Sequence, residues 1–549
     1  MKKKIKITLV AISVFFASFL TISFTDNYFE IAKNLDIFTS LYKELNIYYV
    51  DETDPGKLMK KGIDAMLKSL DPYTTYIPES EIEDVRFMTT GQYGGIGAII
   101  TKRDDYVFIS EPYEGFPAQK AGLMAGDKIL EINGVSAKGK STEEVSKVLK
   151  GQPNTSVTLL MERKDLTFEV SFEREKVTVE SIPYFGFVGD GIGYIKLRSF
   201  TRNCSKDIKD ALTELKKQQE LNGLILDLRG NPGGLLNESV SISNIFIERG
   251  EQIVSTKGKI KEWEKVYTAT QKAEDTETPL VVLINQSSAS ASEIVSGVIQ
   301  DLDRGVIIGN KSFGKGLVQQ SRKLSYNTQL KVTIAKYYIP SGRCIQALDY
   351  SNRNKDGSVG EVPDSLKTAF KTKNGRTVYD GGGIEPDIEI EQEKVGNIII
   401  SLLSKRLIFD FATDYRSSHD TIKNANNFLF TDEEFEDFKT FLAGKEYEYS
   451  TQTEDKVEEL KEVAKEEFYY EEIANEYDAL ILKLEINKKD DLNKFKPKIK
   501  EILTSEIASR YYYQKGRIIA NLQFDKHIKE AIELLNNNSK YNSILSGNE

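Results

Sequence analysis

Histidine and cysteine are scarce in this chain, which has two of each in 549 residues. Cys204 and Cys344 are too few and too distant in sequence for a disulfide framework or a zinc site, so neither a redox compartment nor a metal follows from them. His419 and His527 both lie in the C-terminal region, and there is no G-x-S-x-G motif. The sequence therefore argues against a Ser/His/Asp triad.

A strong excess of one charge is also missing. The net charge is −10, and lysines and acids are interspersed rather than segregated. This pattern argues against nucleic acid as the main partner. Single hydrophobic cores rarely exceed roughly 250–300 residues, so the length predicts three or four domains.

One long apolar run begins the chain. Four lysines precede the uncharged segment from Ile7 to Phe24, as in a signal sequence: Lys2, Lys3, Lys4 and Lys6. At ~1.5 Å per residue the run is barely long enough to span a bilayer, and Thr21-Ile22-Ser23 is a weak cleavage candidate. Residues 1–25 are thus either a cleaved signal peptide or a retained membrane anchor, and a buried core helix is the remaining alternative. The basic side should face the cytoplasm, so we expect the rest of the chain on the extracytoplasmic, periplasmic side of the inner membrane.

Residues 26–88 show helical spacing of apolar side chains, and residues 89–174 change to short alternating strands with glycine turns. The second region contains the turn Gly94-Gly95-Ile96-Gly97-Ala98 and, after a suitable interval, Gly126-Asp127-Lys128-Ile129-Leu130-Glu131-Ile132-Asn133-Gly134. The turn alone fits any hairpin, but this order of segments resembles a PDZ domain. The resemblance implies a groove in which backbone N–H groups hold a peptide carboxylate and a strand edge pairs with the peptide. Its expected peptide-binding residues are Gly94, Gly95, Ile96, Gly97 and Ala98.

Residues 175–392 read as an α/β core. Apolar strands at 191–197, 223–228, 281–284 and 305–309 alternate with amphipathic helices, which predicts a mostly parallel sheet. In such sheets ligands collect where strands end and glycine loops begin. We therefore expect the loops at 229–234, 285–292 and 309–316 to converge.

Ser290 lies in one of these loops, where an apolar strand gives way to small residues and then to helical spacing at Glu293, Ile294 and Val298. A helix N-terminus there would stabilise negative charge on a substrate oxygen. By themselves, these serines could equally be caps and packing residues.

The loop at 309–316 has two possible functions. Gly309 to Lys315 fits the phosphate-loop pattern G-x-x-x-x-G-K, but Gly316 stands where a hydroxyl must bind Mg²⁺, which disfavours a nucleotide hydrolase. If Ser290 is a nucleophile, its base has to be something other than histidine, and a lysine can serve when burial lowers its pKa. Lys315, between two glycines, is the candidate; a solvated turn residue is the alternative.

From about Ile47 to Ile390 the chain resembles the carboxyl-terminal processing (tail-specific) serine peptidases. The shared motifs, in order, include Ser69-Leu70-Asp71-Pro72, Asp227-Leu228-Arg229-Gly230-Asn231-Pro232-Gly233-Gly234, Ser288-Ala289-Ser290-Ala291-Ser292-Glu293, Phe313-Gly314-Lys315-Gly316 and Gly382-Gly383-Ile384-Glu385-Pro386-Asp387. The resemblance implies Ser290 as nucleophile, Lys315 as base and Gln319 as the residue that orients the lysine, with no cofactor and no metal. Backbone N–H groups of Ala291 and of Gly233 or Gly234 are the expected oxyanion donors.

The sequence departs from the family pattern in three places. Gln286-Ser287 replaces common glycines before the nucleophile, and Tyr73 stands where a histidine usually follows Asp-Pro. Residues 393–549 form a charged, strongly helical extension unlike the shared core. A helical cap packed on the protease is one interpretation of this extension, and dimerisation or substrate shielding is another.

The sequence thus predicts a multidomain α/β protein with an N-terminal helical segment, a PDZ domain, an α/β serine-protease core and an α-helical C-terminal extension. Its expected partners are proteins or peptides with free C-termini and, if residues 1–25 are uncleaved, the membrane; association with a second copy of the chain stays open. Two functions stay open: an active envelope peptidase, whose PDZ domain either delivers substrate or gates activity, and a catalytically silent PDZ scaffold.

Overall fold

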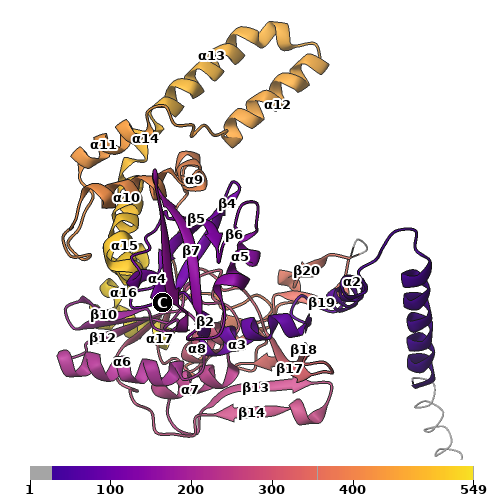
Figure 1. Cartoon of the computed structure of the whole chain (residues 1–549). Helices are drawn as coiled ribbons and strands as arrows, with labels where there is room; N and C mark the ends of the chain where they lie inside the picture. Colours follow the sequence, from indigo (N-terminus) through magenta and orange to yellow (C-terminus); the bar gives the residue numbers. More distant parts are fainter. Residues whose placement is uncertain (1–27, 355–356, 548–549) are drawn as a thin grey trace, which may run out of the picture. The chain divides into compact units, whose positions relative to one another are not determined.

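The computed structural model describes residues 28–354 and 357–547 (Figure 1). The chain divides into two units, one made of the residues up to Ile77 together with Ser321–Val332, the other of Pro78–Gln320 and the residues from Thr333 onward. The predicted signal peptide or anchor at 1–25 lies outside the described residues. Within the described ranges, no helix has both the length and the apolar character that crossing a membrane requires.

The first unit is mainly helical, as the sequence predicts. A helix covers residues 28–48, and α2 spans Pro55–Lys68, where the Asp54 side chain caps the first turn by accepting from the Lys57 N–H at 3.0 Å. The short strand β1, Thr75–Ile77, pairs antiparallel with the beginning of β18. This strand was not predicted, because three residues carry no periodic signal.

The PDZ region of the second unit is built on a sheet in the order β3-β4-β5-β7-β8, with β6 paired to β5. Strand β3 lies at the edge of this sheet, and the flanking strands β2 and β9 pair with each other. Val107, Ile129 and Leu159 are among the fully buried side chains of its core. Its elements are β2 Gln92–Gly95, β3 Ala98–Arg103, β4 Tyr106–Pro112, α4 Pro117–Lys120, β5 Lys128–Ile132, β6 Val135–Ser136, α5 Thr142–Leu149, β7 Ser156–Arg163, β8 Leu166–Glu173 and β9 Glu175–Thr178; α3, Ile82–Thr90, precedes them.

The protease core is a sheet in the order β10-β11-β12-β15-β16-β23, in which every pair after β10–β11 is parallel. Its helices α6, α7 and α8 pack on one face in the largest apolar cluster. The expectation of a mostly parallel α/β core is confirmed. The elements are β10 Tyr184–Gly189, β11 Ile192–Lys196, α6 Cys204–Gln218, β12 Gly223–Asp227, α7 Leu236–Phe246, β15 Leu280–Ile284, α8 Ala291–Asp301, β16 Val306–Gly309 and β23 Ile388–Glu389.

Smaller strands complete the core. A second sheet contains β13 and β14 beside β18, with β17 paired to β18, and two short hairpins follow. These strands are β13 Gln252–Gly258, β14 Lys265–Thr268, β17 Leu317–Lys323, β18 Gln329–Tyr338, β19 Leu348–Arg353, β20 Val359–Glu361, β21 Ala369–Lys371 and β22 Thr377–Tyr379.

The C-terminal extension is helical, as predicted, but it contributes more than a cap. Its last two helices, α16 and α17, pack on the second face of the protease sheet, where Leu534 and Ile544 join Ile225 and Leu283 in one apolar cluster. Helices α12 and α13 form an antiparallel pair that extends away from the other helices (Figure 1). The helices are α9 Asn397–Ser404, α10 Leu407–Ser418, α11 Asp432–Leu442, α12 Gln452–Glu466, α13 Tyr470–Lys489, α14 Asp491–Lys494, α15 Lys496–Leu522, α16 Lys526–Leu535 and α17 Asn538–Ser546.

Candidate active site

Ser290 lies at the junction of β15 and α8, as the residue just before the first helical turn. All five residues of β15 are buried, so the strand fixes where the chain turns. Ser290 has φ 55° and ψ −111°, which is a strained conformation for a residue with a side chain. Strain of this kind persists only where neighbouring contacts enforce it, and it clusters at functional sites.

Glu293 makes contacts that hold Ser290 in this strained conformation. Its fully buried carboxylate accepts from the backbone N–H groups of Ser290, at 2.7 Å, and of Lys315, at 2.9 Å, on the same oxygen, Oε2. Its Oε1 accepts from Ser312 Oγ and the Gly314 N–H, both at 2.6 Å. Burial raises the pKa of the Glu293 carboxyl above its ordinary value, while these four hydrogen bonds act in the opposite direction. One side chain therefore joins the backbone of the predicted nucleophile to that of the predicted base.

Tyr337, on β18, makes a second link between the same two residues. Its hydroxyl lies 2.7 Å from the carbonyl oxygen of Lys315 and 3.2 Å from that of Ser290, and its side chain is only 1% exposed. Two independent contacts thus fix the distance between residues that are 25 positions apart in the sequence. The expected convergence of the 285–292 and 309–316 loops is confirmed.

The loop at 229–234 joins the same site through Asn231. The carbonyl oxygen of this fully buried residue accepts from the Ala289 N–H, at 3.0 Å, and from Ser292 Oγ, at 2.9 Å. The Gly230 N–H also donates to the side chain of Asn285, at 3.0 Å. All three predicted loops therefore meet at the carboxyl ends of the parallel strands.

Glycine is required at position 233 by the close approach of this loop to the nucleophile. A Cβ atom there would lie 2.9 Å from Ser290 Cβ and 2.9 Å from the Ala291 nitrogen, and φ is +96°. The Gly233 N–H donates to the Asn231 side chain at 2.9 Å, so in this structure it already has an acceptor within its own loop. Gly234 and Ala291 supply the neighbouring amides, and the assignment of oxyanion donors among these residues stays a prediction.

The other predicted catalytic residues lie nearby. The half-buried Lys315 lies two residues before the first residue of β17, and Gln319 lies on that strand. The Gln319 side-chain amide donates to Thr333 Oγ1 at 3.3 Å. Its role in orienting the lysine stays a prediction.

The expected peptide-binding turn connects β2 to β3. Gly94 and Gly95 belong to the β2–β9 ladder, Ile96 is buried, and Ala98 begins the edge strand β3. The Ile96 carbonyl accepts from the Ala118 N–H at 2.8 Å, which ties the turn to α4. Within the part of the chain that the structure describes, β3 pairs with β4 alone, so a peptide strand can pair with its other side, next to helix α5.

Three family models match this chain: Peptidase family S41 at residues 191–350, a PDZ domain at 108–163, and the C-terminal helical domain of probable PDZ-proteases at 398–535. The "Probable CtpA-like serine protease" of Staphylococcus aureus strain N315 is 34% identical over 373 residues, which cover 63% of this chain and 74% of that protein. The "Carboxy-terminal-processing protease" of Bartonella bacilliformis is 36% identical over 329 residues, 59% of this chain and 75% of its own.

The chain belongs to peptidase family S41. Among solved structures, the photosystem II D1 C-terminal processing protease is 28% identical, with a TM-score of 0.35, and the match covers 64% of this chain and 92% of that one. The three family models and the two relatives show that this S41 peptidase is a carboxy-terminal processing serine protease with a PDZ domain and a C-terminal helical domain.

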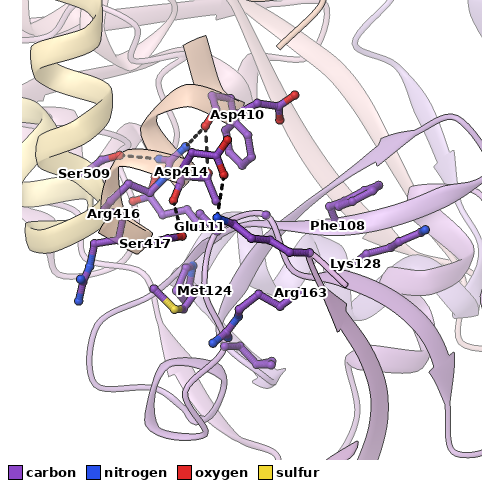
Figure 2. A pocket seen from close by; sticks show the side chains of 18 of the residues that line it. Phe108, Glu111, Met124, Lys128, Arg163, Asp410, Asp414, Arg416, Ser417 and Ser509 are labelled. Carbon is purple, nitrogen blue, oxygen red and sulfur yellow. Dashed lines mark hydrogen bonds and ion pairs between the residues drawn. The ribbon is translucent and has the colours of Figure 1, made fainter. Parts of the chain in front are cut away.

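In this S41 peptidase the PDZ and C-terminal helical domains pack together around a cavity of about 530 Å³. Figure 2 shows PDZ side chains such as Phe108 and Arg163 beside residues of α10 and α15. An ion pair joins Arg103 to Asp410 at 2.9 Å across this interface, and another joins Glu111 to Arg517 at 2.7 Å. The helical domain thus contacts both the PDZ domain and the protease sheet.

Sequence reasoning did not assign a role to three residues that organise the S41 site: Glu293, Asn231 and Tyr337. Glu293 carried a usable signal, because a serine followed three residues later by glutamate before an apolar run is the capping-box spacing. Asn231 was quoted only as part of a motif. Tyr337 carried no local signal, since its contacts depend on how β18 packs.

We expect Glu293→Gln to lower kcat by about ten- to a hundredfold, because misplacing reacting groups by 1 Å can cost that much. In either orientation the new NH₂ group faces a backbone N–H that has lost its acceptor, at a cost of about 1–3 kcal/mol. Steady-state kinetics and thermal unfolding would measure both effects. The matched control is Glu434→Gln, whose two oxygens accept from Tyr415 and from the Thr431 N–H in the helical domain. Wild-type kcat in Glu293→Gln would contradict the positioning role.

Proposed function

We propose that this chain is a cell-envelope serine endopeptidase that captures the C-terminus of protein substrates in its PDZ domain and hydrolyses peptide bonds with a Ser290–Lys315 dyad. The observation that carries the proposal is the convergence of the Ser290 and Lys315 amides on one oxygen of the buried Glu293. The membership of family S41 and the PDZ domain support the reaction class.

The proposed mechanism is acyl transfer. Neutral Lys315 accepts the Ser290 proton as the hydroxyl oxygen attacks the peptide carbonyl carbon, and it returns that proton to the leaving amine when the C–N bond breaks. A water molecule then attacks the acyl-enzyme ester by the same proton route and regenerates Ser290. The oxyanion is held by backbone N–H groups at the start of α8 and in the 229–234 loop, with Ala291 and Gly233 or Gly234 as the proposed donors.

Envelope location is part of the proposal and is supported by the four lysines followed by the apolar segment from Ile7 to Phe24. Cell fractionation, together with protease accessibility in intact and in permeabilised cells, would test it. Recovery of the full chain in the cytosol would contradict it.

The test of the function uses the full chain and an unstructured protein with an apolar C-terminus. We expect cleavage of this substrate. Cleavage of the same protein with an amidated C-terminus should be slower, because the amide lacks the negative charge that the backbone N–H groups of the PDZ groove bind. Mass spectrometry of the products would locate the cut sites. Binding of the intact substrate without any cleavage would instead favour the PDZ scaffold.

We expect kcat/KM to decline as pH falls from 9 to 6, because the lysine base is active only when neutral. The buried carboxyl of Asp227 does not cause this decline. Burial acts to raise the pKa of Asp227, but the charges of Arg229 and Lys196 outweigh it and hold the pKa well below its usual value. Stability from such a lowered pKa is complete above the unfolded value near 4 and is lost only at more acidic pH.

His527 is the control for the pH profile, because its ring nitrogen lies 3.5 Å from Asp525, which pairs with Arg229 of the 229–234 loop. The decline should persist in His527→Gln. A flat wild-type profile under conditions where chemistry limits the rate would contradict a lysine base.

A further inference from the structure

An ion pair joins the C-terminal helical domain to the 229–234 loop of the protease core. Asp525, directly before α16, binds the guanidinium of Arg229: NH1 lies 3.0 Å from Oδ1 and NH2 lies 2.7 Å from Oδ2. Arg229 begins the 229–234 loop, two residues after β12 ends at Asp227. A residue near the end of the chain thus contacts the base of the loop that carries Gly233.

The Arg229 side chain is held from both sides. On the sheet side its Nε and NH2 contact the fully buried carboxylate of Asp227, at 3.0 and 2.8 Å. Asp227 also accepts from the Tyr194 hydroxyl at 2.7 Å and from Lys196 Nζ at 3.1 Å. Two carboxylates, one guanidinium and one ammonium balance in charge, as buried ionic groups require. Without Asp525 the cluster would keep an excess positive charge.

The charged side chains around Arg229 also hold the backbone of the 229–234 loop. The Arg229 N–H donates to Asp227 Oδ1 at 2.9 Å, so the arginine is tied at both its backbone and its side chain. Two residues later the Asn231 carbonyl holds the nucleophile turn, and at Gly233 the loop approaches Ser290 too closely for a Cβ atom. A shift of Arg229 therefore reaches the nucleophile through a short, closely packed stretch of backbone.

We propose that Asp525 is a positioning residue for the peptidase reaction: by holding Arg229, the C-terminal helical domain sets the geometry of the 229–234 loop at Ser290. The inference rests on the proposed function, because it takes Ser290 as the nucleophile. It gives the helical domain a part in catalysis that does not depend on substrate binding.

Asp525 also caps α16, since its Oδ1 accepts from the N–H groups of His527, at 2.9 Å, and Ile528, at 3.4 Å. Asparagine caps helices about as well as aspartate does. It cannot, however, offer two charged oxygens to a guanidinium. Asp525→Asn therefore separates the capping role from the positioning role.

The experiment compares wild type, Asp525→Asn and Asp525→Glu in the full chain. For Asp525→Asn we expect kcat to fall by about ten- to a hundredfold with KM unchanged, and the affinity for a peptide aldehyde that forms a tetrahedral adduct to fall by a similar factor. Affinity of the PDZ domain for a C-terminal peptide should stay at the wild-type value. Asp525→Glu, which retains the charge, should recover part of kcat.

Asp432→Asn is the matched control, because it makes the same change in the same domain and breaks ion pairs with Lys496 and Lys500. It should leave kcat unchanged. A wild-type kcat in Asp525→Asn would overturn the proposal, as would a loss that disappears at a temperature where both proteins are fully folded.

If Asp525→Asn does not fold, the Arg229→Lys variant tests the proposal instead. This substitution leaves the cap of α16 intact and removes the bidentate pair with Asp525. A lowered kcat with unchanged KM would support positioning, and a wild-type kcat would overturn it. Failure of the proposed function is distinguishable: activity would then survive Ser290→Ala, whatever Asp525→Asn does.

Discussion

Alanine at Ser290 or at Lys315 is expected to lower kcat by a factor on the order of 10⁴ to 10⁶, the range seen when members of a catalytic unit are removed. Loss of Ser290 removes the oxygen atom that forms the acyl-enzyme. Loss of Lys315 leaves the Ser290 hydroxyl without a proton acceptor. Because the two groups act as one unit, the double variant should be no slower than either single one. Mass spectrometry of a defined substrate over time would measure the loss.

Two controls lie in the same loops. Ser287→Ala changes an exposed serine of the nucleophile turn, and Lys311→Ala changes a lysine of the following loop that pairs with Glu385 at 3.5 Å. Both should retain wild-type kcat. Binding of a C-terminal peptide, measured by fluorescence anisotropy, should be unchanged in all four single variants. Comparable activity in Lys315→Ala and Lys311→Ala would contradict the proposed Ser290–Lys315 dyad.

Added primary amines offer a further check on Lys315. A small alkylamine can enter the space left in Lys315→Ala and accept the proton in place of the missing side chain. We expect partial recovery of activity that increases with amine concentration, and no recovery in Ser290→Ala. An equal response of both variants would show that the amine acts elsewhere.

Deletion of residues 524–549 is expected to abolish folding of the protease core. These residues supply the helices that cover one face of the sheet, including five large, nearly fully buried side chains: Ile528, Leu534, Leu535, Tyr541 and Ile544. At about 1.5–3 kcal/mol for each buried side chain, their loss costs on the order of 10 kcal/mol, comparable with the whole net stability of a typical domain. Soluble yield and circular dichroism would reveal the failure.

The pair α12–α13 provides the contrasting deletion. Its helices pack on each other, for example through the hydrogen bond from the Tyr477 hydroxyl to Glu458, and Glu454 pairs with Lys488 at 3.0 Å where the two helices begin and end. A short Gly/Ser linker can therefore replace residues 455–487. We expect this variant to fold and to cleave small peptides as the wild type does.

A single substitution in α16 measures how much this helix contributes to the stability of the protease core. Leu534→Ala should cost about 2–5 kcal/mol, as for other fully buried leucines, whereas Leu482→Ala, at a leucine of α13 that is 58% exposed, should cost little. Thermal unfolding would measure both. Equal stability of the two variants would contradict the assignment of α16 to the protease core.

The sheet and its loops could be predicted from the sequence because their signals are local. The strand at 281–284 is a continuous apolar run, and the glycines of the 229–234 loop mark a close approach of the backbone. Helical spacing after Ser290 identified α8. These signals, with the ordered family motifs, selected Ser290 and Lys315 as candidates.

The contacts that join the loops could not be predicted, because they depend on packing between distant segments. Nothing around Tyr337 indicates that its hydroxyl bridges the carbonyls of Ser290 and Lys315. The apolar face of α16 predicts a buried helix, but its periodicity does not say which surface it covers. The role of Asp525 depends on which surface α16 covers, so only the folded structure reveals it.

The covering of the sheet by α16 and α17 also sets an order of events during synthesis. Ribosomes make the chain from its N-terminus, so β11, β12 and β15 emerge long before the helices that bury their second face. We expect the nascent chain to lack an ordered catalytic loop until its last turns are made, which would protect the synthesis machinery from premature proteolysis. Pulse-labelled hydrogen exchange during refolding would test this, since β12 should gain protection together with α16 and not before it.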